Sequence, residues 1–346
     1  MTDDRRRLGF FTRVLDDGPP AERYRLAIEQ IVTAERVGFD TAWVAQHHFH
    51  RDEGGLPSPF VLLAAAAAVT RRIGLGTSIV TLPLEAPLRV AEDAAVLDAL
   101  SGGRVELGIG SGGTSSSFPP FGHDPADRPA IYAEHARVLA SALRGDILTA
   151  DGGALYPPAP HLLETLWEAT FSASGAARIG AAGHGLMLSR TQPRPEGRAT
   201  LDAVQQELLD AHRAALPAGV RQRIFASRSV FVADDAKTAH DLAIRGVERA
   251  LPLARAAGLD VPDGPPERLV ELLDLHVGTP AEVVASLQRD TVVAHATDIV
   301  FQAHPVDPAH ELVLRSIELI AAEVAPALGW SPAGGSTDPT TRGGVT

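Results

Sequence analysis

The sequence predicts an α/β fold in which eight parallel strands alternate with helices and close into a (β/α)₈ barrel, with insertions in the loops that follow the strands. Short apolar runs of strand length alternate with longer segments of helical periodicity, which is the pattern of parallel βαβ units. The runs lack the pattern of charges and prolines that protects the edges of an open sheet. A length of 346 residues suits one barrel with insertions, since such barrels range from about 200 to more than 400 residues.

The expected elements follow one another in order. The strands are expected at Leu8–Val14, Thr41–Ala45, Ile73–Leu82, Val105–Ile109, Trp167–Phe171, Gly185–Ser189, Arg223–Val232 and Thr297–Gln302. The helices are expected at Glu22–Val37, Pro59–Thr70, Pro87–Leu100, Pro129–Arg144, Ser174–Ala182, Thr200–Ala215, Ala236–Ala257, Thr279–Gln288 and Pro308–Ala325. Helix ends carry the usual signals, because Gly38 and Gly102 follow helices as C-caps do and Pro87 begins one. Loops or insertions are expected at Gly110–Arg128, Asp151–Pro160, Thr191–Glu196 and Val261–Pro266.

Composition narrows the class of protein. We expect one domain over residues 1–328 and a flexible low-complexity tail over 329–346. The net charge of −12 argues against nucleic-acid binding, and the absence of cysteine excludes disulfides, thiolate catalysis and iron–sulfur clusters. The longest apolar run, Phe60–Val69, is too short to span a bilayer, and no signal peptide is recognisable at the N-terminus. A soluble cytoplasmic protein is therefore expected.

Functional groups of such a barrel lie on the loops after the strands. The first candidate there is Gln46–His50, with three histidines in four residues. A metal site is disfavoured, because His47 and His48 would point in opposite directions in an extended segment and no carboxylate cluster supports them. General acid–base or hydrogen-bonding work by one histidine is favoured, since imidazole titrates near neutral pH; simple loop packing is the alternative.

Two further candidates are rich in small residues. Gly108–Gly113 matches GxGxxG after a strand, but the following Ser and Pro residues cannot open the helix that a dinucleotide fingerprint requires. Gly110 and Ser111 remain a plausible ligand-binding loop, because glycine lets a backbone approach a ligand closely. Phe171–Ala177 runs from a strand end into a helix start, where hydroxyls and free N–H groups form an anion site. Ordinary capping by Ser172 or Ser174 is the alternative.

Taken together, these residues resemble the bacterial luciferase-like flavin-dependent monooxygenases over about residues 8–325. The most characteristic block is Ala34–Trp43 followed by His47-His48-Phe49. The resemblance continues at Thr70–Thr77, Leu82-Pro83, Pro87–Arg89, Leu97-Asp98, Ser101–Arg104, Gly108–Gly110, Phe121-Gly122, Phe171–Ser174 and Gly278–Pro280. It implies a TIM-barrel fold, a non-proline cis peptide at Ser78–Ile79 and reduced FMN as co-substrate. His47 matches the family's catalytic histidine, and Ser172 with the amides of Ala173, Ser174 and Gly175 falls where the family binds the FMN phosphate.

Two positions depart from the family pattern. Gln46 replaces the glutamate that usually precedes the paired histidines, which removes a negative charge beside His47. Ser111 stands where the light-emitting enzymes place an arginine near the phosphate, and Arg190 is the candidate to compensate. Both departures argue against aldehyde luminescence as the activity.

The resemblance favours a monooxygenase that receives reduced FMN from a separate NAD(P)H:flavin reductase and oxygenates a small organic substrate through a flavin C4a-peroxide. A deazaflavin-dependent hydride-transfer enzyme and a non-catalytic flavin-binding protein are the alternatives. A homodimer is also expected, because Phe60–Val69 is apolar all round and Pro87–Leu100 has few charges, so both helices would be covered on their outer side. Burial of the first helix beneath Gly110–Arg128 is the alternative.

Overall fold

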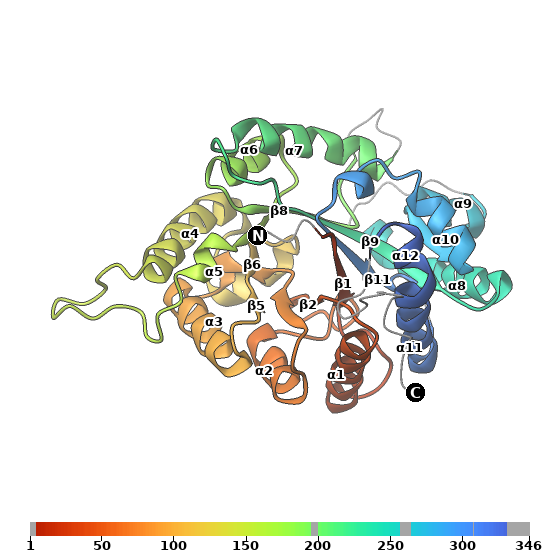
Figure 1. The fold of residues 1–346 in the computed structure, drawn as a ribbon, viewed down its shortest axis with the longest axis horizontal. Helices are drawn as coiled ribbons and strands as arrows, with labels where there is room; N and C mark the ends of the chain where they lie inside the picture. The colour runs from red at the N-terminus through yellow and green to blue at the C-terminus, as the bar shows by residue number, and fades with distance from the viewer. Residues whose placement is uncertain (1–4, 195–199, 257–263, 307, 331–346) are drawn as a thin grey trace, which may run out of the picture.

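The computed structural model describes residues 5–194, 200–256, 264–306 and 308–330, and its strands form a ring of eight positions (Figure 1). In chain order the positions are β1 (Arg7–Thr12), β2 (Thr41–Val44), β3 (Gly74–Thr77) with β4 (Val80–Thr81), β5 (Val105–Glu106) with β6 (Gly108–Gly110), β7 (Trp167–Ala169), β8 (Gly185–Leu188), β9 (Ile224–Val232) and β11 (Asp298–Gln302). All their pairings are parallel, and β11 returns to β1. The predicted barrel is confirmed.

Two of the eight positions are divided into two short strands. The cis peptide Ser78–Ile79 separates β3 from β4, and Leu107 separates β5 from β6. The first halves pair with each other, as do the second halves, and β6 then pairs with β7, so the ring is continuous. The cis peptide lies where the family resemblance implied it, at the carboxyl end of the third strand position.

Helices surround the ring (Figure 1). The long ones are α1 (Pro20–Arg36), α2 (Pro59–Val69), α3 (Pro87–Ser101), α4 (Arg128–Arg144), α6 (Ala173–Ala181), α7 (Leu201–Ala215), α8 (Ala236–Ala256), α10 (Pro280–Leu287) and α11 (His310–Leu319). Shorter ones are α5 (His161–Glu164), α9 (Pro266–Leu272) and α12 (Ala325–Ala327). Between α4 and α5 the chain extends outward as an arm, where an excursion was expected (Figure 1).

The main addition to the predicted fold is a strand, β10 (Leu275–Gly278), with the preceding α9. It pairs with Ser229–Val232, the second half of β9, while the first half of β9 carries the barrel pairings to β8 and β11. The first half of β9 therefore belongs to the barrel, and its second half holds the added strand β10. The expected tail beyond residue 330, and parts of the Thr191–Glu196 and Val261–Pro266 segments, lie outside the described residues.

Aromatic side chains fill the barrel interior. Trp43, Trp167 and Phe225 meet edge to face, with ring centroids 4.8–6.2 Å apart. Glycines on neighbouring strands make room for them, because a Cβ at Gly76 would collide with the Trp43 ring and one at Gly185 with the Trp167 ring. Since the interior is a packed core, a ligand has space only at the rim.

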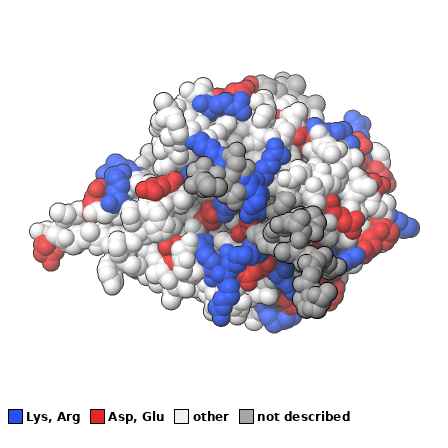
Figure 2. Space-filling view, viewed as in Figure 1, with Lys and Arg blue, Asp and Glu red and all other residues white. Residues whose placement is uncertain are grey.

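Charges on the face drawn in Figure 2 are of mixed sign, with red and blue atoms intermingled. A nucleic-acid surface would instead gather basic residues in a stripe or patch. In the part of the chain that the structure describes, no helix has both the length and the apolar character needed to cross a bilayer.

Candidate active site

The carboxyl ends of the strands bring several of the predicted residues together. A Cβ placed on Gly110 would lie 3.0 Å from Ile79 and 3.4 Å from Ala169. The cis peptide Ser78–Ile79, the end of β6 and the end of β7 therefore meet at one surface, and Ser78 N donates to Val44 O at 2.8 Å. Glycine at position 110 keeps this surface flat enough for the close approach of a planar ligand. No α-helix opens after Gly110 before α4, as expected for a loop that is not a dinucleotide fingerprint.

His47, the predicted catalytic residue, lies beside the partly buried Arg13. Arg13 Nε donates to His47 Nε2 at 3.2 Å. Nε2 must therefore accept, which places the imidazole proton on Nδ1, the atom that faces Glu53 Oε2 at 4.0 Å. Gly54 makes room for the ring, because a Cβ there would collide with it.

Charge and burial keep this histidine neutral. Burial lowers the pKa of His47 to about 3, and the positive charges of Arg13 and Arg190 lower it further in the same direction. At neutral pH the residue is therefore an uncharged imidazole that can donate from Nδ1, and its Nε2 lone pair is available as a base only if Arg13 moves.

The second histidine faces another neighbour, as predicted for an extended segment. His48 packs against Phe121 with ring centroids 4.9 Å apart, and its Nε2 is buried without a hydrogen-bond partner. Two hydrogen bonds also join the loop after β2 to the loop after β6. His50 Nε2 lies 2.8 Å from Ser116 Oγ, and Thr114 Oγ1 donates to Glu53 Oε2 at 2.7 Å. The loop after β6 therefore closes one side of the histidine loop.

The segment after β7 combines helix capping with the features of an anion site. Ser172 is the N-cap of α6, and its Oγ accepts from Gly175 N at 3.1 Å. Ser174 Oγ lies 3.4 Å from Ser172 Oγ, and a Cβ on Gly175 would collide with Thr170 Oγ1. Ser172, Ala173 and Ser174 are exposed, and first-turn N–H groups such as those of Ala173 and Ser174 lack intrahelical partners. These residues fit a phosphate group, so Ser172 can cap the helix while the same helix N-terminus binds an anion.

Arg190, the residue expected to compensate at the phosphate, bonds to residues outside the Ser172–Gly175 segment. Its Nε donates to Gln302 Oε1 at 2.6 Å and its Nη1 to Ser229 Oγ at 3.4 Å, so its described hydrogen bonds reach strands β11 and β9. Arg190 also contributes to the lowered pKa of His47. The structure thus groups Arg190 with His47 and Arg13, and no described contact joins it to Ser172–Gly175. The expectation that Arg190 compensates for Ser111 at the phosphate gains no support from this geometry.

Gln46 was expected to alter the charge beside His47, but its side chain bonds to other residues. Its Nε2 donates to Glu85 Oε1 at 2.6 Å and to Pro57 O at 3.0 Å, and its Oε1 accepts from Thr81 N at 2.7 Å. The side chain therefore joins the end of β2 to β4 and the Leu82–Leu84 turn, rather than contacting His47. The carboxylate near His47 is Glu53.

Sequence reasoning missed Arg13, Gln302 and His304. Each follows, or ends, a strand at the carboxyl rim, so the rule that selected His47 applies to them equally. They were not singled out because none belongs to a recognisable local motif. The described residues contain no group of three or more His, Cys, Asp or Glu side chains arranged to hold a metal ion.

A rim with these features defines an α/β-barrel enzyme whose site is assembled from the loops after its strands. The family model for luciferase-like monooxygenases matches residues 8–296, and the chain belongs to this family. An uncharacterized protein of Sinorhizobium fredii is 36% identical over 173 residues, which are 48% of this chain and 49% of that protein. The 4-hydroxyprotoasukamycin monooxygenase of Streptomyces nodosus subsp. asukaensis is 42% identical over 112 residues, 32% of this chain and 30% of that one. The matches thus span about half or less of these relatives.

Solved structures share the fold over nearly the whole chain. Monooxygenase RslO1 from Streptomyces bottropensis has a TM-score of 0.75 at 24% identity, covering 92% of this chain and 99% of that one. The oxygenating constituent of 3,6-diketocamphane monooxygenase from Pseudomonas putida, a complex with FMN, scores 0.72 at 21% identity, covering 93% and 98%. The coenzyme F420-dependent tetrahydromethanopterin reductase of Methanopyrus kandleri scores 0.66 at 19% identity, covering 94% and 99%.

Proposed function

We propose that the protein is an FMN-dependent monooxygenase that takes reduced FMN from a separate NAD(P)H:flavin reductase and uses O₂ to oxygenate a small organic substrate. The observation that carries the proposal is the arrangement of the rim. An exposed helix N-terminus suited to phosphate follows β7, beside the flat surface at Gly110, and the neutral His47 lies on the loop after β2 that the loop after β6 contacts. Family membership and the FMN complex of a protein with the same fold support this reading.

Bound reduced FMN would supply the electrons and the activation of O₂. The protein's own residues would do the positioning. The α6 N-terminus, with Ser172 and Ser174, would hold the phosphate, and the Ser78–Ile79 and Gly110 backbone would support the ring system. His47 would present an Nδ1–H donor without a competing positive charge of its own. The joined loops around His48 and Phe121 would limit the access of water.

A deazaflavin-dependent hydride-transfer enzyme is the second candidate, because coenzyme F420-dependent proteins share the fold. A flavin-binding protein without turnover is the third. Anaerobic binding of reduced FMN and of reduced F420 separates the first two, followed by admission of air and measurement of O₂ consumption. The proposal expects tight binding of reduced FMN and a rate of O₂ consumption that the protein changes from that of free reduced FMN, which reacts with O₂ by itself. Preferential F420 binding, with no reaction with O₂, would establish the second candidate instead.

We also propose a homodimer formed through α2 and α3, which lie side by side on the outside of the barrel (Figure 1). Exposed apolar residues of these helices are Val61, Ala65, Ala68, Val69, Leu88, Val96, Ala99 and Leu100. The exposed charges on α3 include Arg89, which pairs with Glu92 and Asp93. Val61 and Leu100 are each 70% exposed, so the Gly110–Arg128 loop does not cover them. Exposed apolar side chains gathered on two neighbouring helices are typical of an interface.

Replacing Ala65 and Ala68 by Glu tests the dimer. Both are exposed in the single chain, so the double variant should fold with unchanged thermal stability of the monomer but bury charges in the proposed interface. Light scattering should report monomers for this variant and dimers for the wild type. The matched control is Ala133→Glu, an exposed alanine on α4 outside the α2–α3 surface. A double variant that remains fully dimeric contradicts the proposed surface.

A further inference from the structure

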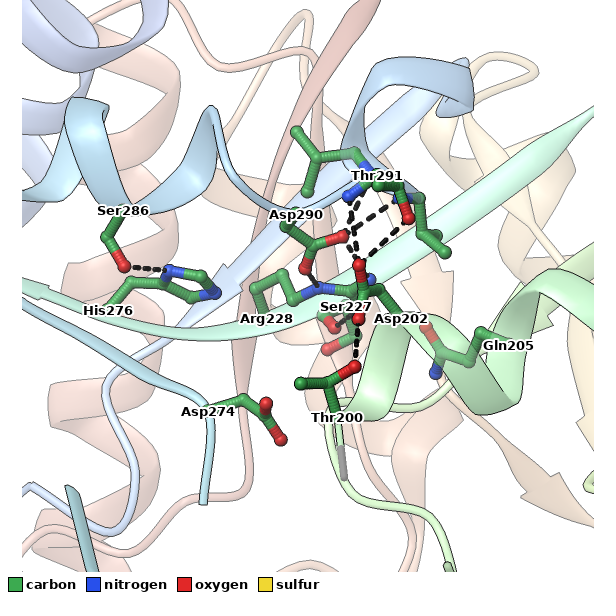
Figure 3. A network of polar contacts seen from close by, with 12 residues as sticks. Thr200, Asp202, Gln205, Ser227, Arg228, Asp274, His276, Ser286, Asp290 and Thr291 are labelled. Carbon is green, nitrogen blue, oxygen red and sulfur yellow. Dashed lines mark hydrogen bonds and ion pairs between the residues drawn. The ribbon is translucent and has the colours of Figure 1, made fainter. Parts of the chain in front are cut away.

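Two arginines elsewhere in this molecule, one buried and one partly buried, pair with carboxylates, whereas buried Arg23 donates to the backbone carbonyls of Gly18 and Arg51. Arg228 is fully buried, and its Nε lies 2.5 Å from Asp290 Oδ2 within a polar network between β9, β10 and α7 (Figure 3). Arg7 pairs with Glu106 and with Asp298 at the opposite end of the barrel. This is the expected arrangement, because a buried charge without a partner is strongly unfavourable.

Arg13 and Arg190 differ from them. Arg190 is 8% exposed, yet its hydrogen bonds go to the neutral Gln302 and Ser229. Arg13 donates from Nε to the neutral His47, and Glu53 is the carboxylate that favours its charge from further away. Over the described ranges, neither guanidinium forms an ion pair within 4.0 Å. Burial lowers the pKa of Arg13 to about 10, and burial with the charge of Arg13 lowers the pKa of Arg190.

A cavity opens beside these arginines, between the ends of β1 and β11. Arg13, Gln302, His304 and Arg249 line it, together with apolar side chains such as Phe11 and Val306. His304 Nδ1 is buried without a hydrogen-bond partner, so a polar group of a ligand that enters the cavity could bond to it. Burial and the neighbouring arginines lower the pKa of His304, so it is a neutral ring that can donate one hydrogen bond.

The same cavity also contains acidic groups at its outer part. Asp17 is exposed to solvent. Asp16 is already engaged, because Gln30 Nε2 donates to its Oδ1 at 2.9 Å and His310 Nδ1 lies 3.5 Å from the same oxygen. Neither carboxylate forms an ion pair with Arg13 or Arg190 in the described structure. The inner part of the cavity therefore keeps an uncompensated positive charge next to His47.

We infer that the organic substrate of this enzyme carries an anionic group, a carboxylate or a sulfonate, which binds in this cavity to Arg13 and His304 with the charge of Arg190 behind them. The inference rests on the proposed function, in which His47 stands beside the reacting end of the substrate. An anion here would supply the counter-charge that the two arginines lack, and Arg13 has both Nη groups left for a bidentate contact once Nε is bound to His47. The apolar lining would hold the carbon chain of the same molecule.

Calorimetric titration of the full chain loaded with oxidised FMN tests the inference. The probes are butanoate, octanoate and butane-1-sulfonate, with 1-butanol and 1-octanol as neutral partners of equal chain length, all at one ionic strength. We expect at least one anion to bind about tenfold or more tighter than its alcohol, since a hydrogen bond to a charged group is worth about 1.5–3 kcal/mol. Arg13→Met should remove this preference. Arg25→Met is the matched control on the surface, where Arg25 pairs only with Glu22 and Glu29 of its own helix in the described structure.

The outcomes are distinct. Equal binding of anions and alcohols, no measurable binding of any anion, or an unchanged preference in Arg13→Met would each overturn the inference. A fall in FMN affinity in Arg13→Met, measured in a separate titration, would overturn it too, because the anion would then be the FMN phosphate. Circular dichroism of each variant excludes misfolding, and Arg13→Lys should retain part of the preference. Failure of FMN to bind to the wild type would instead refute the proposed function, while titration without FMN would still report on the anion site.

Discussion

Replacing Ser172 by Asp places a negative charge at the N-terminus of α6 without removing its cap. Ser172 Oγ accepts from Gly175 N at 3.1 Å, and Asp and Asn are N-cap residues as good as Ser. The variant should therefore fold and unfold like the wild type. Any change in cofactor affinity then reports on the charge and not on the loss of the helix cap.

The magnitude follows from Coulomb's law. A carboxylate about 5 Å from a unit negative charge costs roughly 1 kcal/mol in water and roughly 3 kcal/mol at an effective dielectric of about 20. Ser172 is exposed, which favours the lower figure, but a phosphate monoester carries about −1.5 to −2 charges near neutral pH. The expected penalty is about 1.5–3 kcal/mol, a loss of about tenfold to a hundredfold in FMN affinity.

Fluorescence titration of FMN at low, fixed salt measures this loss, and added salt should reduce it because exposed charges are screened. Ser172→Asn is the matched control, since it keeps the cap and nearly the shape of Asp without the charge. Riboflavin, which lacks the phosphate, is the second control and should bind both variants alike. If Asp and Asn variants bind FMN equally, the phosphate does not lie at the N-terminus of α6.

Three further predictions concern the histidine loop. His47→Ala should fold normally and lose most turnover, whereas His48→Ala, which removes a packing contact with Phe121, should cost less; steady-state rates with reduced FMN decide, and the reverse order would contradict the assignment. The pKa of folded His47 is about 3, against an ordinary 6.5, so between these pH values the unfolded chain binds a proton that the native state does not. This residue therefore makes the free energy of unfolding fall as the pH drops from about 6.5 toward 3. Thermal unfolding of His47→Gln should depend less steeply on pH in that range, and identical profiles of the variant and the wild type would refute the calculation. Gln46→Glu should destabilise the protein by about 1–3 kcal/mol in denaturant unfolding, because it removes the donor to Glu85 and places two carboxylates together, and unchanged stability would show that the loop rearranges.

The sequence by itself determined the order of the elements and predicted the end of the barrel at which the candidate site lies. Hydrophobic periodicity, proline and glycine at helix ends, and the rule that strand ends carry function depend on local chemistry, which is readable along the chain. Seven of the named candidates, from Ser78 to Gly175, lie at strand ends at that rim, as does His47. The same reasoning overlooked β10, because four residues after a proline-rich segment are too few to show a period.

Only the tertiary structure decided which side chains face one another. Gln46 stands next to His47 in the chain yet bonds to Glu85, 39 positions away, while Arg190 reaches Gln302 across 112 positions. The low pKa of His47 likewise arises from burial and from two arginines that follow other strands, Arg13 after β1 and Arg190 after β8. Closure of the ring brings such residues together, and because hydrogen bonds and charge interactions depend on distance in space, no local pattern in the sequence records them.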